Sequence, residues 1–155
     1  NREFEDEIKV PEALNASLRS YQITGFQWLK VLDSYKFGGI LADDMGLGKT
    51  IQLLAIVLSY LEGNDNPNPS MVVCPSSLTL NWKNEISKFA PSIKTLVISG
   101  NAEERERQIR SVRNYNMVIS SYDLLKRDID IYKDINYEFK YIIADEAQYV
   151  KNNNT

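Results

Sequence analysis

Apolar positions along this chain fall into two patterns, short continuous blocks and longer stretches with helical spacing. The short blocks are typical of strands that are buried on both faces, as in a parallel sheet. They are Ile40-Leu41-Ala42, Met71-Val72-Val73-Cys74, Thr95-Leu96-Val97-Ile98, Met117-Val118-Ile119-Ser120 and Tyr141-Ile142-Ile143-Ala144. Because these blocks alternate with helical stretches, the pattern predicts an α/β fold, doubly wound, with a mostly parallel sheet and helices on both faces.

Apolar residues at helical spacing predict a helix before the first strand and further helices between the strands. The predicted ranges are from Ser17 or Arg19 to beyond Leu32, Ile51 to Leu61, Ser77 to Phe89, Asn101 to Val112 and Tyr122 to Arg127. Asn101 and Glu104 have the spacing of a capping pair, and residues 63–69 are dense in turn formers and predict a loop. We expect residues 1–17 to form a lead-in segment and residues 18–155 to form one domain.

The composition fits a globular domain with a single core. Of the 155 residues, 43% are hydrophobic and 25% are charged. No apolar run approaches the roughly 20 residues that a membrane span needs, and the acidic first residues lack the order of a secretory signal, so we expect an intracellular protein without membrane contact. Cys74 is the single cysteine and histidine is absent, which argues against a disulfide or a zinc site. The net charge of −3 indicates that any contact with nucleic acid is local.

The segment Asp43-Asp44-Met45-Gly46-Leu47-Gly48-Lys49-Thr50 lies between a predicted strand and a predicted helix, as a phosphate-binding loop does. Glycines let backbone N–H groups turn towards phosphates, and the following helix presents its positive N-terminus to the same anion. Lys49 would reach the β and γ phosphates, and the Thr50 hydroxyl would bind magnesium. The alternative is a glycine-rich turn with a solvated lysine. The full pattern has a glycine where this chain has Asp43.

A pair of acidic residues, Asp145 and Glu146, directly follows the last apolar strand. Two carboxylates at the end of a buried strand suit metal-assisted phosphoryl transfer, in which Asp145 holds magnesium and Glu146 orients and deprotonates the attacking water. Taken alone, such a pair is more often a plain strand end with solvated acids. A phosphate-binding loop earlier in the same domain favours the functional interpretation.

Five segments together resemble the SWI/SNF-type ATPases of helicase superfamily two. The segments are Leu18-Arg19-Ser20-Tyr21-Gln22 with Gly25 and Trp28-Leu29, then Asp43 to Thr50, then Cys74-Pro75-Ser76-Ser77-Leu78 with Asn81-Trp82 and Glu85, then Ser120-Ser121-Tyr122, and finally Asp145-Glu146-Ala147-Gln148 with Lys151-Asn152. The resemblance covers nearly the whole chain after Leu18. It also accounts for Asp43, since the family has an acidic residue there in place of the expected glycine.

The resemblance implies that residues 18–155 are the first RecA-like lobe, incomplete and without the second lobe, and that ATP and magnesium bind to it. The residues implied to hold the nucleotide are Gln22, Asp44, Met45, Gly46, Leu47, Gly48, Lys49 and Thr50. Gln22 would hydrogen-bond the adenine, with an exposed helix glutamine as the alternative. Lys49 and Glu146 are implied to be catalytic, and Thr50 and Asp145 to bind magnesium.

Nucleic-acid contacts are implied near Ser76, Trp82, Ser121 and Tyr122. For Trp82 and Tyr122 the apolar spacing favours core packing over a direct contact. Gln148 replaces a histidine that is commoner in the family, at a position implied to couple the ATP site to the second lobe. The coupling between the lobes is therefore the property that this difference puts in question.

The activity that the resemblance implies is ATP-dependent translocation along double-stranded DNA, in the cytoplasm or nucleoid of a bacterium or the nucleus of a eukaryote. Three alternatives stay open: a helicase acting on RNA or single-stranded DNA, a nucleotide switch that does not hydrolyse ATP, and a small-molecule P-loop kinase. Arginines from the second lobe are implied to complete the site, and such an arginine is worth about a thousandfold or more in rate. We therefore expect the chain alone to bind magnesium-ATP and to hydrolyse it barely.

The resemblance also implies a gap in the sheet. In similar folds, a further strand lies between the strand before the phosphate loop and the strand before Asp145, and this chain stops short of it. We expect the sheet either to close the gap imperfectly or to take a strand from a neighbouring molecule, because buried unpaired edges are costly.

Overall fold

The computed structural model of the chain describes residues 39–42 and 47–145, and the predicted lead-in and first helix lie outside this range. The strands are β1 (Gly39–Ala42), β2 (Ser70–Cys74), β3 (Thr95–Val97), β4 (Met117–Ser121) and β5 (Ile142–Asp145). The helices are α4 (Leu47–Glu62), α5 (Thr79–Phe89), α6 (Ala102–Arg110) and α7 (Tyr122–Ile135), with short 3-10 helices η1 (Ser76–Leu78) and η2 (Val112–Asn114). Each strand predicted from the sequence is present within one or two residues of its predicted bounds.

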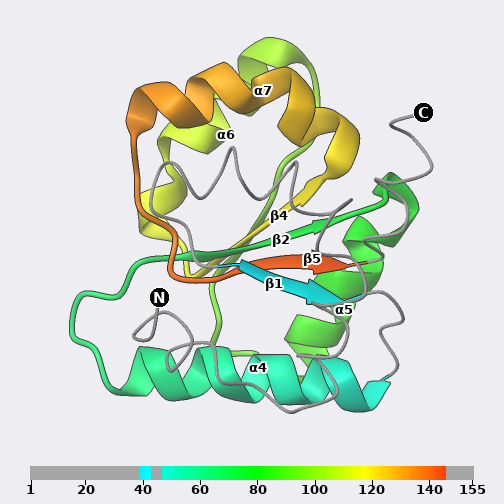
Figure 1. The fold of residues 1–155 in the computed structure, drawn as a ribbon, viewed down its shortest axis with the longest axis vertical. Helices are drawn as coiled ribbons and strands as arrows, with labels where there is room; N and C mark the ends of the chain where they lie inside the picture. The colour runs from blue at the N-terminus through cyan, green and yellow to red at the C-terminus, as the bar shows by residue number, and fades with distance from the viewer. Residues whose placement is uncertain (1–38, 43–46, 146–155) are drawn as a thin grey trace.

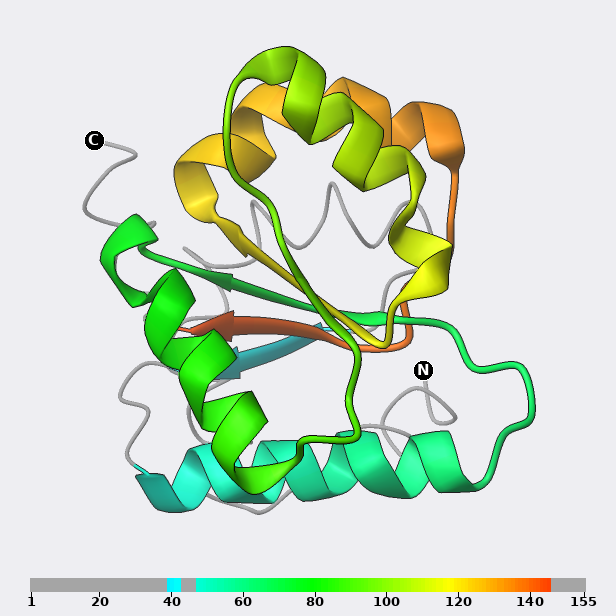
Figure 2. The same cartoon turned by 180° about the vertical axis from the view of Figure 1, so that it is seen from behind.

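The described strands form one parallel sheet in the order β1-β5-β2-β4-β3. Helices α4 and α5 cover one face of the sheet, and α6 and α7 cover the other (Figure 1, Figure 2). The predicted α/β fold, doubly wound with helices on both faces, is therefore confirmed. No helix in this described part of the chain is long and apolar enough to cross a membrane.

Side chains of β2, β3, β4 and β5 alternate between two hydrophobic cores, one on each face of the sheet. In β2, Val72 and Cys74 belong to the core under α4 and α5, whereas Met71 and Val73 belong to the core under α6 and α7. Successive strand residues point to opposite faces, so both faces of a central strand must be apolar. This is why the strand blocks are continuous in the sequence.

Helix α4 begins at Leu47, earlier than the sequence pattern predicts. Thr50, Leu53, Leu54 and Val57 form its buried face and have the spacing of successive helical turns. The first of them is a polar residue, so the hydrophobic pattern alone placed the start of the helix too late. Gly48, Lys49 and Thr50 therefore belong to the first helical turn, where backbone N–H groups have no partner within the helix.

Helix α7 extends to Ile135, well past the predicted end at Arg127. Its buried face continues through Asp128 and Tyr132, and the aspartate conceals the helical period in the sequence. The helix ends where Asn136 adopts a left-handed conformation with φ of 47°, a common helix stop.

Strands β1 and β5 pair directly with each other, from Gly39 opposite Ile142 to Ala42 opposite Asp145. The expectation that a neighbouring molecule supplies a strand between them is wrong for this structure. Direct pairing lets the backbone groups of the two strands satisfy each other, which removes the reason for borrowing a strand.

Candidate active site

The last residues of four strands meet along one edge of the sheet. Ala42 of β1 lies opposite Asp145 of β5, and Cys74 of β2 lies opposite Ser121 of β4. Because β2 also pairs with β5, the order along this edge is Ala42, Asp145, Cys74, Ser121. Ligands of parallel α/β sheets bind at the carboxyl ends of the strands, so this edge is the candidate site.

Helix α4 starts at this same edge, after the four residues that follow β1 (Figure 1). Its first turn contains Leu47, Gly48, Lys49 and Thr50, and the Thr50 side chain is only 2% exposed. A helix N-terminus offers partly positive N–H groups to an anion. The other residues predicted to hold the nucleotide lie outside the described residues, and they are Gln22, Asp44, Met45 and Gly46. The catalytic candidate Glu146 also lies outside them.

Asp145 is held by hydrogen bonds from both faces of the sheet. Its side chain is on the same face as Ile143, two residues earlier, and there Nε1 of Trp82 donates to Oδ2 at 2.8 Å. From the opposite face, the hydroxyl of Tyr122 donates to the main-chain oxygen of Asp145, also at 2.8 Å. Asp145 is only 3% exposed, and a buried carboxylate needs such partners.

Trp82 and Tyr122 are therefore core residues that hydrogen-bond to Asp145. Each is only 4% exposed, which leaves neither side chain on the surface where a nucleic acid could touch it. The sequence left open whether these side chains pack in the core or contact nucleic acid, and in the structure they pack in the core. The sequence could not show the contact with Asp145, because its partners are far apart in the chain.

Cys74 lies beside Asp145 and is completely buried. Burial, together with the negative charge of Asp145, raises the pKa of its thiol from 9.0 to about 12. The thiol therefore stays neutral at physiological pH and behaves as a small hydrophobic residue.

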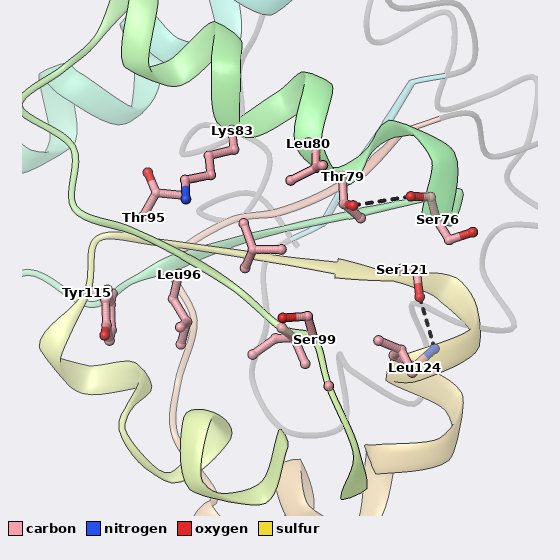
Figure 3. A pocket seen from close by; sticks show the side chains of 13 residues that line it. Ser76, Thr79, Leu80, Lys83, Thr95, Leu96, Ser99, Tyr115, Ser121 and Leu124 are labelled. Carbon is pink, nitrogen blue, oxygen red and sulfur yellow. Dashed lines mark hydrogen bonds between the residues drawn. The ribbon is translucent and has the colours of Figure 1, made fainter. Parts of the chain in front are cut away.

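A pocket of about 590 Å³ opens next to this edge and extends along β3, whose residues and the segment up to Gly100 line it between η1 and α5 on one side and the start of α7 on the other (Figure 3). Two predicted nucleic-acid candidates line it. Ser76 is exposed at the start of η1, whereas Ser121 is buried and its Oγ accepts the backbone N–H of Leu124 as the N-cap of α7. Further polar groups in the lining come from Thr79, Lys83, Ser99 and Gly100.

These additional lining residues were missed in the sequence. Thr79 and Lys83 follow Ser76 along the same helical stretch, and Oγ1 of Thr79 donates to the main-chain oxygen of Ser76 at 3.1 Å. Ser99 and Gly100 follow β3 closely. The signal that could have found them is their shared position, because they follow the carboxyl ends of neighbouring parallel strands.

Thr50 and Asp145 fit the donor chemistry of magnesium. A hydroxyl and a carboxylate supply hard oxygen donors, which Mg²⁺ prefers, and both side chains are buried. Within residues 39–42 and 47–145 there is no group of three or more His, Cys, Asp or Glu residues that could hold a metal ion. In phosphoryl-transfer proteins, one or two protein ligands usually hold magnesium together with water and phosphate oxygens.

A family model for the SNF2-related domain matches residues 21–155. The chain is 41% identical over 140 residues to an uncharacterized ATP-dependent helicase of Mycoplasma genitalium, and 39% identical over 163 residues to the human TATA-binding protein-associated factor 172. These matches cover 90% and 97% of this chain, but only 13% and 9% of the two relatives. The chain thus spans about a tenth of the length of these curated relatives.

Solved structures of the same family also match this chain. The SWI2/SNF2 ATPase core of Sulfolobus solfataricus in complex with double-stranded DNA matches with a TM-score of 0.51 and 32% identity, over 82% of this chain and 31% of that one. A structure of the same core domain without DNA in its description matches with a TM-score of 0.51 and 33% identity, over 83% and 30% of the two chains.

Proposed function

Since this chain belongs to the family of SNF2-related domains, we propose that it is the first, ATP-binding lobe of a motor that moves along double-stranded DNA. The observation that carries the proposal is the register of β1 and β5, in which Ala42 lies opposite Asp145. This pairing brings the acidic motif and the start of α4 to the same edge of the sheet. Phosphoryl transfer needs an anion-binding helix terminus and a metal-binding carboxylate side by side.

The nucleotide would bind at the start of α4. Gly48 and Lys49 lie in its first turn, so that backbone N–H groups and the lysine can meet the phosphates. Asp44, Met45 and Gly46 would complete the phosphate loop. Gln22 is proposed to hydrogen-bond the adenine.

Thr50 and Asp145 would hold magnesium, which would neutralise negative charge on the phosphates. Asp145 is suited to this role because its carboxylate orientation is fixed by Trp82. Glu146, the next residue, is proposed to orient the attacking water and to take its proton. Lys49 stabilises the charge that develops on the transferred phosphate.

Duplex DNA is proposed to bind at the pocket of about 590 Å³. Hydroxyl groups and one lysine suit a sugar-phosphate backbone, because such groups bind phosphate oxygens without reading the base sequence. The proposal is supported by the archaeal ATPase core, which is described in complex with double-stranded DNA. Ser76 and Lys83 are the proposed contacts, while Ser121, Trp82 and Tyr122, which are buried, would act from within the fold.

The test is ATP turnover by the full-length protein with duplex DNA, single-stranded DNA or RNA. We expect duplex DNA to stimulate turnover most, and Lys49→Ala to abolish the stimulated rate. Lys133→Ala, an exposed lysine near the end of α7, is the matched control. A preference for single strands or RNA would favour the helicase alternative, and binding of ATP without turnover would favour the nucleotide switch.

The second lobe is proposed to complete the site with arginines. The isolated chain is therefore expected to bind magnesium-ATP and to hydrolyse it at least about a thousandfold more slowly than the full-length protein with DNA. Vigorous turnover by the isolated chain would contradict a shared site.

A further inference from the structure

Two aromatic side chains connect the walls of the pocket to Asp145. Nε1 of Trp82 donates to Oδ2 of Asp145, and the hydroxyl of Tyr122 donates to its main-chain oxygen, each at 2.8 Å. The two side chains reach Asp145 from opposite faces of the sheet, since they belong to different cores. All three residues are buried, so water does not compete for these hydrogen bonds.

The first wall of the pocket is rigidly linked to Trp82. Ser76, Thr79 and Lys83 line the pocket, and the hydrogen bond from Thr79 to Ser76 joins η1 to the first turn of α5. Trp82 belongs to the same helix, directly before Lys83, but its ring lies in the core. Any shift of α5 caused by a ligand at Ser76 or Lys83 must therefore move the indole that holds the Asp145 side chain.

The second wall is linked to Tyr122 in the same way. Ser121 and Leu124 line the pocket at the start of α7, and the Ser121 hydroxyl caps this helix (Figure 3). Tyr122 is the first residue of the helix and follows Ser121 directly. A shift of the helix start therefore moves the hydroxyl that holds the Asp145 main chain.

We propose that Trp82 and Tyr122 are positioning residues that transmit the state of the pocket to Asp145, so that nucleic acid in the pocket changes how tightly Asp145 and magnesium hold ATP. The inference rests on the proposed function and assigns to these two residues the coupling between its two sites. A charge-assisted hydrogen bond to one carboxylate oxygen sets the orientation of the whole carboxyl group. Coupling of this kind is reciprocal, so ATP also changes the affinity for the duplex.

The test uses the full-length protein, a fluorescent non-hydrolysable ATP analogue with Mg²⁺, and saturating duplex DNA. The coupling is the ratio of the Kd values for the analogue without and with the duplex, and we expect it to be about fivefold or more in the unsubstituted protein. Trp82→Phe removes the indole N–H, and Tyr122→Phe removes only the hydroxyl. In each variant we expect the ratio to fall towards one, while the affinity for the duplex alone changes less than about twofold.

Tyr132→Phe is the matched control for Tyr122→Phe. Tyr132 is equally buried on α7, and its hydroxyl has no hydrogen-bond partner among the described residues, so its loss should leave the ratio unchanged. A second measurement, the Kd of the analogue in EDTA, distinguishes a positioning role of Trp82 from a merely structural one. There the unsubstituted protein and Trp82→Phe should bind the analogue with the same Kd, because Asp145 acts on ATP through the metal.

The outcomes distinguish the inference from the proposed function. An unchanged ratio in folded Trp82→Phe and Tyr122→Phe, or a ratio of one in the unsubstituted protein, overturns the coupling role. Should Trp82→Phe fail to fold, Tyr122→Phe decides by itself, since it removes a single oxygen atom. Failure of the unsubstituted protein to bind either the analogue or the duplex refutes the proposed function instead.

Discussion

The indole N–H of Trp82 lies 2.8 Å from Oδ2 of Asp145, although 63 positions separate the two residues in the sequence. The alternation of side chains along β5 decides this contact. Because Asp145 is an even number of residues after Ile143, its carboxyl group points to the face that α5 covers. The preceding residue, Ala144, lies on the other face, where Tyr122 lies.

Asp145→Asn is expected to abolish the magnesium dependence of nucleotide binding. The substituted amide keeps a similar shape and can still accept the Trp82 hydrogen bond, but it lacks the negative charge that favours a cation. We expect the affinity for magnesium-ATP to fall about tenfold or more. Titration of a fluorescent ATP analogue with and without EDTA measures this, with Asp134→Asn on the exposed face of α7 as the control. Equal sensitivity to EDTA in Asp145→Asn and the unsubstituted protein would contradict the assignment.

The buried ion pair between Arg105 and Asp128 is expected to be sensitive to the loss of one partner. Nε and Nη2 of Arg105 donate to the two carboxylate oxygens at 2.8 and 3.0 Å, and Nη1 donates to the main-chain oxygen of Gly100 at 2.9 Å. Arg105→Ala should lower the free energy of unfolding by about 3 kcal/mol, because it leaves a buried carboxylate without its counter-charge. Urea denaturation measures the change.

A double substitution separates charge burial from packing at this pair. Arg105→Met with Asp128→Leu should be less destabilising than Arg105→Ala alone, since no uncompensated charge remains. The control is Arg110, which is exposed and pairs with the exposed residues Glu106 and Asp134. Arg110→Ala should leave the urea midpoint nearly unchanged. A double variant that is no more stable than Arg105→Ala would show that the pair matters mainly through its shape.

The start of α6 is expected to depend on a capping box. The Asn101 side chain accepts the backbone N–H of Glu104, and the Glu104 side chain accepts the backbone N–H of Asn101, both at 2.8 Å. Asn101→Ala should therefore cost about 1 kcal/mol of stability. Thermal denaturation checks this, and Asn114→Ala on the exposed end of η2 serves as the control.

Gly100→Ala should be at least as destabilising as Asn101→Ala. Gly100 has φ of 95°, a conformation that residues with a side chain rarely adopt, and a Cβ there would meet the Glu104 carboxyl group. Moving Glu104 aside would also break the capping box, so the costs of Gly100→Ala and Glu104→Ala should not add. Strict additivity in thermal denaturation would exclude this shared mechanism.

The stability of the protein is expected to fall with rising pH above about pH 9 because of Cys74. Burial raises the pKa of the folded thiol to about 12 from 9.0, so between these values the unfolded chain has lost a proton that the folded chain keeps. The folded state therefore loses stability as pH rises, by at most about 1.4 kcal/mol per pH unit from this group. Below pH 9 both states are protonated and the effect vanishes.

Cys74→Ala provides the comparison for this pH dependence. The variant should lose stability less steeply between pH 9 and pH 11 in urea denaturation, because the ionisable group is gone. The Tyr132 phenol, whose pKa is also raised by burial, contributes in the same direction and remains in both proteins. Identical slopes in the two proteins would show that the thiol is not shielded as the structure indicates. Because the thiol is buried, it should react with a thiol reagent only after the protein unfolds.

Local pattern made the fold class predictable. Strands that are buried on both faces are almost wholly apolar, and their blocks were recognisable from β2 to β5 without any contact being known. The limits of two helices were predicted less well, because Thr50 and Asp128 are polar residues on buried faces. A hydrophobic period cannot include such a residue until its partner is known.

The sequence by itself determined the succession of strands and helices, the capping box of α6, and the positions of the phosphate-loop and acidic motifs after their strands. These features depend on residues that are near one another in the chain. Only the tertiary structure decided that β1 pairs with β5, that Arg105 binds Asp128, and that Trp82 and Tyr122 bind Asp145 rather than face a ligand. The physical reason is that burial and hydrogen bonding of a polar group depend on partners that only the folded chain brings within reach.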